Sequence, residues 1–235
     1  MTKNQGSTIS TKAKIGKNVK IGNFVIIEDG VEVGDDSKIG NFCILRKDVR
    51  IGNNAELSNH IEIGESCIIG MHATIDSYTL IKNDLVIGDN AQIGSFSILH
   101  EESKFGKDNF IGSYCELGKG LNVGDNNIIQ GRIRTGDFCT IENDVTIKYG
   151  TILTARVLLK TKAFLGPNVI TLGSTHKRVT VHGTIIGSST YIGAGSKIAG
   201  GTLIGDNITT GALSFVNKNI QEPGIYVGVP IKKIK

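Results

Sequence analysis

A period of six residues dominates the sequence. Starting at Ile9, every sixth residue up to Leu165 is a large apolar residue, with Thr135 as the exception. The residue that follows is very often glycine, and the fifth residue of each hexad is usually small or apolar. A period of six matches neither the 3.6-residue period of a helix nor the two-residue alternation of a half-buried strand. The hexads therefore predict a solenoid of stacked short strands, a β-helix.

The geometry of such a coil restricts which residues can occupy the corners between the strands. Each hexad points one large and one small side chain inward, and the polar residues turn the corner. Glycine suits a corner that needs a positive φ, because it has no Cβ to clash. Every strand then pairs with strands about 4.8 Å above and below it, which satisfies the backbone. We therefore expect a stiff all-β prism with a core of inward-facing side chains.

The hexads also predict how the chain is organised. We expect a single domain over residues 1–235, with uninterrupted hexads at 9–170 and further hexads at 186–221. The interval at 171–185 is 15 residues long, which is not a multiple of six, so part of it must leave the coil as a loop. Residues 222–235 are expected to form a C-terminal tail. No linker or low-complexity segment divides the chain.

Composition excludes several classes of protein. The formal net charge is +4, and the basic residues alternate with acidic ones without forming a basic stripe, so nucleic-acid binding is disfavoured. No apolar run is long enough for a signal peptide or a membrane span, and we expect a cytoplasmic protein that does not bind membranes. The cysteines share the inward fifth position of their hexads and are expected to be reduced, buried thiols that bind no metal. They are Cys43, Cys67, Cys115 and Cys139.

Several candidate catalytic residues lie where the hexads are interrupted. Long loops on rigid scaffolds are more often functional than the elements that they join. An imidazole titrates near neutral pH, so it can take a proton from an attacking hydroxyl or amine. Corner positions, where a polar residue is expected anyway, account for His60, His72 and His100. The loop at 171–185 contains the remaining histidines and two cations, in the order His176, Lys177, Arg178 and His182.

The hexads resemble the repeats of the left-handed β-helix acyltransferases, in which three hexads make one triangular coil. The resemblance implies a left-handed parallel β-helix of about eleven coils, nine before the interruption and two after it. It covers nearly the whole chain as a fold, whereas its functional motifs lie within residues 141–235.

One functional motif surrounds the loop histidine. Residues 165–176, LGPNVITLGSTH, resemble the G-P-N-V segment and following T-H of galactoside and maltose O-acetyltransferases. That resemblance implies that His176 is the general base, which takes a proton from the acceptor as it attacks a thioester. The O-acetyltransferases usually have proline after this histidine, whereas this chain has Lys177.

A second branch of the same superfamily is also similar. Residues 141–147, 165–169 and 183–187 look like the corresponding segments of nucleotide-sugar N-acetyltransferases, several of which need no protein base. Those enzymes usually carry Asn-Asp in the loop, where this chain has Gly173 and Ser174. Both branches use an acyl-CoA donor.

The end of the chain resembles the acyl-CoA-binding pattern of the family, over residues 210–220 and 227–232. The resemblance implies that backbone groups of Ala194 and Ala212 are open to the pantetheine arm. It also implies a homotrimer, with acyl-CoA in the groove between two prisms. Three residues are implied at the adenine and phosphate end, namely Asn217, Lys218 and Lys232. Outward apolar residues at 18-residue spacing fit a subunit contact: Ile26, Ile44, Leu80, Ile98, Phe110, Ile128 and Phe164.

These features predict an acyl-CoA-dependent acyltransferase without a metal. Its expected reaction is acetyl transfer from acetyl-CoA to an amino or hydroxyl group of a sugar or nucleotide-activated sugar, in surface-glycan biosynthesis. The sequence leaves open the acceptor, N- or O-acylation, the acyl length and the acidic partner of His176.

Two other classes of protein share the prism. A γ-carbonic-anhydrase-like metalloenzyme needs three zinc-ligating histidines, and His176 and His182 have no obvious third partner. A structural or ice-binding scaffold would show ranks of threonine on a flat face, whereas the corners of this chain are mixed and charged.

Overall fold

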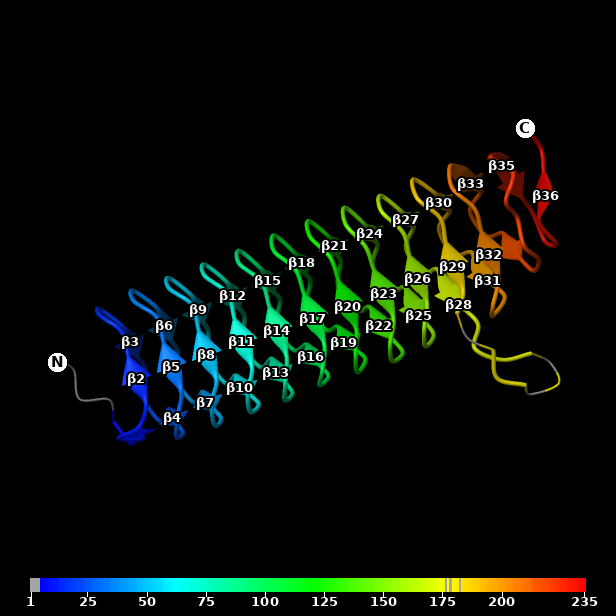
Figure 1. Cartoon of the computed structure of the whole chain (residues 1–235). Coiled ribbons are helices and arrows are strands. Elements are labelled where there is room, and N and C mark those ends of the chain that lie inside the picture. The colour runs from blue at the N-terminus through cyan, green and yellow to red at the C-terminus, as the bar shows by residue number, and fades with distance from the viewer. Residues whose placement is uncertain (1–4, 176, 178, 182) are drawn as a thin grey trace. The chain divides into compact units, whose positions relative to one another are not determined.

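The computed structural model describes residues 5–175, 177, 179–181 and 183–235. Within these residues the secondary structure consists of strands and turns, without a helix that could cross a membrane. The chain divides into two compact units, Met1–Cys115 (unit 1) and Glu116–Lys235 (unit 2). Each unit is a parallel β-solenoid of about six turns (Figure 1). The prediction of an all-β solenoid is confirmed. The left-handed sense of the coil and the single domain over 1–235 stay predictions.

Unit 1 is built from two-residue strands that recur every six residues and form three faces. Each strand pairs in parallel with the strand 18 residues away, as Ile63 does with Leu45 and Ile81. Face A contains β1 (Thr8–Ile9), β4 (Ile26–Ile27), β7 (Ile44–Leu45), β10 (Glu62–Ile63), β13 (Leu80–Ile81) and β16 (Ile98–Leu99). Face B contains β2 (Lys14–Ile15), β5 (Glu32–Val33), β8 (Arg50–Ile51), β11 (Ile68–Ile69), β14 (Val86–Ile87) and β17 (Lys104–Phe105). Face C contains β3 (Lys20–Ile21), β6 (Lys38–Ile39), β9 (Glu56–Leu57), β12 (Thr74–Ile75), β15 (Gln92–Ile93) and β18 (Phe110–Ile111).

Unit 2 has the same three faces. Face A contains β19 (Glu116–Leu117), β22 (Arg134–Thr135), β25 (Ile152–Leu153), β28 (Ile170–Thr171), β31 (Lys197–Ile198) and β34 (Phe215–Val216). Face B contains β20 (Asn122–Val123), β23 (Thr140–Ile141), β26 (Leu158–Leu159), β29 (Ile185–Ile186) and β32 (Leu203–Ile204). Face C contains β21 (Ile128–Ile129), β24 (Thr146–Ile147), β27 (Phe164–Leu165), β30 (Tyr191–Ile192), β33 (Ile208–Thr210), β35 (Gly224–Val227) and β36 (Lys232–Lys233). The last two strands lie in the segment expected as a tail, and they pair antiparallel.

The core of each unit consists of the inward residues that the period predicts. Ile63 and Ile192 are completely buried, whereas Ile9 is 38% exposed because no described coil lies beyond it. The small inward position is often a hydrogen-bond donor. Cys43 Sγ donates to the carbonyl oxygen of Ser58 (3.1 Å), as Ser37 Oγ donates to that of Gly52 (2.9 Å). The cysteines are buried and free, as the sequence predicts.

Glycine has a different role in the corners from the one expected. The positive φ falls on the fourth residue of the hexad, which is seldom glycine; examples are Asn18 (56°) and Phe24 (55°). Glycine at the second position instead allows close stacking of coils. A Cβ on Gly22 would lie 2.6 Å from the carbonyl carbon of Gly40, closer than real Cβ contacts.

The hexads are interrupted once in unit 2, as predicted. After β28 the chain projects from the coil (yellow in Figure 1) and returns at β29, where Ile186 pairs with Leu159. Thr175 N donates to the carbonyl oxygen of Val179 at 2.9 Å, and Val181 N donates to that of Gly173 at 2.9 Å. We call this segment the 172–181 hairpin.

Candidate functional site

The base of the 172–181 hairpin is tightly packed against the coil that follows it. A Cβ on Gly200 would lie 2.6 Å from the Leu172 carbonyl oxygen and 3.0 Å from Val181 Cβ, so this position requires glycine. The predicted base, His176, lies outside the described residues, as do Arg178 and His182. The catalytic assignment of His176 therefore stays a prediction.

The corner between faces C and A has a repeating hydrogen bond in unit 1. Here the side chain of one coil accepts a hydrogen bond from the backbone of the preceding coil. Asn23 N donates to Asn41 Oδ1 at 2.9 Å, and Asn41 N donates to Asn59 Oδ1 at 2.8 Å. Asn59 N donates in the same way to Ser77 Oγ at 3.2 Å. These side chains satisfy a turn N–H that is otherwise left without a partner.

The same corner in unit 2 lacks these side-chain acceptors. Its third positions are occupied by Gly131, Tyr149, Pro167, Ala194 and Ala212. The N–H groups of Ala194 and Ala212 have no hydrogen-bond partner among the described residues, because the residue one coil further on carries no side-chain oxygen. The carbonyl oxygen of Ala194, in contrast, accepts a hydrogen bond from Leu213 N at 2.8 Å. Two backbone donors are therefore available to a ligand at this corner.

An apolar depression of about 350 Å³ lies beside this corner. It extends along the last three coils of face A, from Leu172 at the hairpin base to Gly195 and Leu213 at the corner. The remaining lining residues are Lys197, Ser214, Phe215 and Val229. The depression and the two backbone donors together could hold an aliphatic, amide-bearing molecule.

Four of the five predicted CoA-contacting residues flank face A of unit 2. Half-buried Ala194 and exposed Ala212 precede β31 and β34, at the corner from face C. Exposed Asn217 and Lys218 follow β34, at the opposite edge of the face. That edge is also where the hairpin begins, because Leu172 N donates to Ile198 O and Ala199 N donates to Val216 O, each at 2.8 Å.

Lys232 has a different location from the other four. It is an exposed residue of β36, which belongs to face C and not to face A. The structure therefore does not group Lys232 with Asn217 and Lys218 along one edge.

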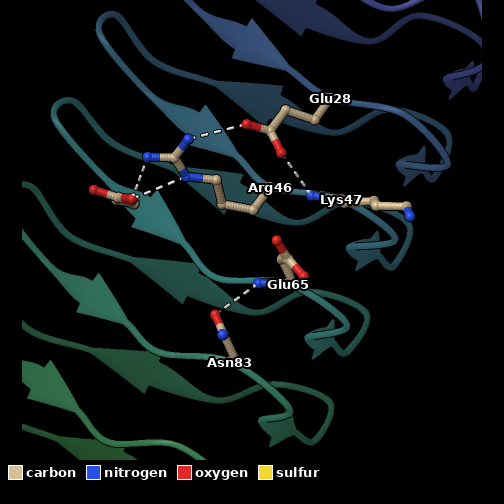
Figure 2. A network of polar contacts seen from close by, with 6 residues as sticks. Glu28, Arg46, Lys47, Glu65 and Asn83 are labelled. Carbon is tan, nitrogen blue, oxygen red and sulfur yellow. Dashed lines mark hydrogen bonds and ion pairs between the residues drawn. The ribbon is translucent and has the colours of Figure 1, made fainter.

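Unit 1 has a depression of another kind, with a volume of about 550 Å³ and many charged lining residues. Arg46 Nη1 contacts Glu28 Oε1 at 3.0 Å, and Arg46 Nη2 contacts Glu62 Oε1 at 2.7 Å. Glu28 also accepts a hydrogen bond from Lys47 N, and Asn83 accepts one from Glu65 N (Figure 2). Hydrogen bonds to the two glutamates raise the pKa of Arg46. Arg46 thus links neighbouring coils and has its charge satisfied within the protein.

The outer edge of the C-to-A corner in unit 1 carries a row of stacked rings. The ring centroids are 4.7 Å apart between Phe42 and His60, and 4.9 Å apart between Tyr78 and Phe96. Tyr78 is 52% exposed, so the row is on the surface. We call it the aromatic corner; its members are Phe24, Phe42, His60, Tyr78, Phe96 and Tyr114.

The described residues that could ligate a metal do not include His176 and His182. No group of three or more His, Cys, Asp or Glu side chains in the described ranges is arranged to hold a metal ion. His60 is stacked between Phe42 and Tyr78, which suits a structural role.

Comparison with protein families gives a separate match for each unit. The model of the GMPPB C-terminal domain matches residues 3–100, and the model "Hexapeptide repeat of succinyl-transferase" matches residues 183–217. The chain is a hexapeptide-repeat solenoid. The second match confirms the repeat that the sequence predicts, and it includes Ala194, Ala212 and Asn217. Among curated proteins, none matches the chain.

Several solved structures are similar to the chain at low identity. PerB from Caulobacter crescentus, in complex with CoA and GDP-perosamine, is 18% identical with a TM-score of 0.41, over 61% of this chain and 57% of PerB. LpxA from Acinetobacter baumannii is 17% identical with a TM-score of 0.48, over 97% of this chain and 72% of LpxA. The acetyltransferase domain of PglB from Neisseria gonorrhoeae is 20% identical with a TM-score of 0.34, over 54% of this chain and 55% of that domain. The match to PerB spans less than two thirds of its length.

One feature of the site and one feature of unit 1 were not predicted from the sequence. The exposed Leu213 beside Gly195 was missed, although a leucine at the fourth position of a hexad is an unusual occupant. The aromatic corner was also missed, because His60 was interpreted alone as a solvated corner. Comparing residues 18 apart, in place of residues six apart, reveals both.

Proposed function

We propose that this chain is an acyl-CoA-dependent acyltransferase. The proposed reaction moves an acetyl group from acetyl-CoA to an amino or hydroxyl group of a sugar or nucleotide-activated sugar, in surface-glycan biosynthesis. The observation that carries the proposal is the pair of N–H groups at Ala194 and Ala212, which have no hydrogen-bond partner among the described residues and lie beside an apolar depression. The amide carbonyls of the pantetheine arm of CoA suit the two N–H donors, and the depression beside them suits an aliphatic part of the donor.

The proposed roles follow the chemistry of the residue types. His176 is the general base, taking a proton from the acceptor as the acceptor attacks the thioester carbonyl, and the thiolate of CoA leaves. Asn217 and Lys218 meet the adenine and phosphate end of the donor at the far edge of face A. Lys232 contributes a positive charge from face C. No metal takes part.

The experiment measures release of free CoA thiol by purified protein. Acetyl-CoA is offered with amino sugars, their dTDP and UDP conjugates and simple glycosides. Acceptor-dependent release is expected with at least one acceptor. The four protein cysteines give little background, because their side chains are buried in the folded protein.

Two histidine variants test whether His176 is the general base, with an exposed histidine of unit 1 as the control. We expect His176→Ala to lower the rate by about 10²- to 10⁴-fold, the usual contribution of a general base. His72→Ala, at an exposed corner of unit 1, should leave the rate unchanged. Absence of release with every acceptor would overturn the proposed function, and a fully active His176→Ala would overturn the role of the base.

We also propose that the chain forms a homotrimer in the cytoplasm. Partly exposed outward residues of face A in unit 1, such as Ile26 and Ile98, support a subunit contact. The free cysteines fit a reducing compartment. Light scattering of the purified protein measures the oligomeric state, and a monomer would contradict the trimer.

A further inference from the structure

Leu213 is an unusual residue at the rim of the apolar depression. It is 74% exposed and has a φ of 55°. Leucine has no side-chain oxygen to stabilise this left-handed conformation, unlike the asparagine and aspartate found at many equivalent corners. Exposed apolar residues with a positive φ also occur at other corners, such as Phe24 and Phe138, but those side chains are aromatic. Among the described residues, Leu213 is the one aliphatic side chain in this conformation.

The Leu213 side chain lies against the preceding coil. A Cβ on Gly195 would be 2.7 Å from Leu213 Cδ2, so the leucine occupies the space above that glycine. Val229, which is 71% exposed, also lines the depression. Leu213 and Val229 therefore give the depression an apolar rim on the corner side.

The surface that lines the depression is mostly apolar and carries little charge. Lys197 Nζ lies 3.5 Å from the carbonyl oxygen of Asn168, so its aliphatic stem faces the lining while its ammonium group is directed toward that oxygen. Ser214 Oγ accepts a hydrogen bond from Gly228 N at 3.1 Å. The chemistry of this surface therefore favours an uncharged aliphatic group.

We propose that this depression holds the acyl group of the thioester donor, and that Leu213 sets the largest acyl group accepted. The inference rests on the proposed function. The depression extends from Leu172, where the 172–181 hairpin begins, to Leu213, which is adjacent to the free N–H of Ala212. A thioester held at that N–H thus has the depression beside its acyl carbon.

The size of the depression indicates which acyl groups fit. An acetyl group takes about the space of two water molecules, and a cavity needs only about 10–15 Å³ of water-accessible space for each of them. The depression offers about 350 Å³, so it has room for a longer aliphatic chain. We expect the protein to use butyryl-CoA as well as acetyl-CoA, and to disfavour succinyl-CoA, which has a carboxylate at the end of a chain of similar length.

The experiment compares kcat/KM for acetyl-, butyryl-, hexanoyl- and succinyl-CoA with one fixed acceptor. One methylene in an apolar pocket changes kcat/KM by about 10- to 200-fold. We therefore expect Leu213→Ala to raise the hexanoyl-to-acetyl ratio at least about tenfold, and Leu213→Phe to lower the butyryl-to-acetyl ratio by a similar factor. Wild-type protein should prefer butyryl-CoA to succinyl-CoA by at least about tenfold.

Two further variants serve as controls. Leu213→Asn keeps a residue suited to the left-handed conformation, and it should shift the ratio in the same direction as Leu213→Ala. Phe138→Ala removes an exposed side chain with a φ of 57° from another corner of unit 2, and it should leave every ratio unchanged.

The outcomes separate this inference from the function on which it rests. An equal change in kcat/KM for all donors in Leu213→Ala would place Leu213 on the shared CoA arm and overturn the inference, while acyl transfer stands. Faster transfer from succinyl-CoA than from butyryl-CoA would also overturn it. Absence of turnover with every donor would overturn the proposed function itself.

Discussion

The corner between faces C and A differs between the two units. In the first coils of unit 1 this corner has side-chain acceptors for its turn N–H groups, as at Asn23 and Asn41, and along unit 1 it carries a row of stacked rings. In unit 2 the equivalent residues are Ala194 with Gly195 and Ala212 with Leu213, where the N–H groups of the alanines have no hydrogen-bond partner in the part of the chain that the structure describes. The inward positions nevertheless follow the same pattern in both units.

The difference shows which positions the fold constrains. The core requires an inward apolar residue in each hexad, and both units supply it. The corner is exposed, so water can satisfy its N–H groups and the fold tolerates many side chains there. In unit 1 the side chains of this corner make contacts within the protein. In unit 2 the N–H groups of Ala194 and Ala212 have no partner among the described residues and lie beside an apolar depression.

The largest expected effect tests whether the cores are equivalent. Ile63→Ala in unit 1 and Ile192→Ala in unit 2 each remove a completely buried side chain. Each should lower the free energy of unfolding by about 2–5 kcal/mol, because the remaining cavity is only partly filled by relaxation. Urea denaturation measures the loss. Ile9→Ala, at a position 38% exposed, is the control and should cost clearly less. Unequal losses at the two buried positions would contradict equivalent cores.

The second prediction concerns one buried thiol in each unit. Burial raises the pKa of Cys67 and of Cys139 from 9.0 to about 11. Because the folded state holds each proton more tightly, the stabilisation is complete below about pH 9 and is lost as the pH rises toward 11. Two pKa units correspond to about 2–3 kcal/mol for each thiol.

The measurement for the thiols compares urea denaturation at pH 8 and pH 11. Cys67→Ser and Cys139→Ser should each reduce the loss of stability at high pH, because serine does not titrate in this range. Serine also occupies the equivalent inward position at Ser37, so the variants are expected to fold. A pH dependence unchanged in both variants would show that other groups cause the loss.

The third prediction concerns a variant that gives the corner of unit 2 a side-chain acceptor like those in unit 1. An asparagine in Ala212→Asn should accept a hydrogen bond from Ala194 N, as Asn41 does from Asn23. Loss of one donor to the ligand, about 1–1.5 kcal/mol, should raise KM for acyl-CoA about tenfold without lowering the melting temperature. Ser95→Asn, at the same corner of unit 1, is the control. An unchanged KM in Ala212→Asn would show that the corner at Ala194 and Ala212 is not part of the donor site.

The smallest expected effect concerns the aromatic corner. Tyr78→Ala removes a ring that stacks on His60 and Phe96. We expect the free energy of unfolding to fall by about 1 kcal/mol, the usual scale for an aromatic pair, with kcat and KM unchanged. Thermal denaturation and the thiol assay measure the two quantities. A loss of activity with retained stability would show that unit 1 contributes directly to the reaction.

Prediction from the sequence succeeded where the signal was local. The hexads located Ile63 and Ile192 in the core, the cysteines at inward positions and the interruption after β28. It failed where the outcome depends on the neighbouring coil. Glycine was expected to supply the positive φ of the corners, whereas Gly22 avoids a clash with Gly40, a residue that lies 18 positions away.

The candidate site shows the same division. Ala194 and Ala212 were predicted from a motif, but the reason that their N–H groups are open is found in the stacking of coils. Lys232 was predicted to meet the same end of the donor as Asn217 and Lys218; it lies in β36 of face C, and its role stays a prediction. The short antiparallel pairing of β35 and β36 has no six-residue signal, so the sequence did not indicate it.

The sequence by itself determined the strand period, the inward residues and the single interruption, because these depend on residues within one or two hexads. The tertiary structure alone decided which corners have satisfied N–H groups, which rings stack and where the apolar depression lies. These properties depend on pairs of residues that coil closure brings together from 18 or more positions apart. The period therefore establishes the scaffold, and the contacts between coils distinguish one corner from another.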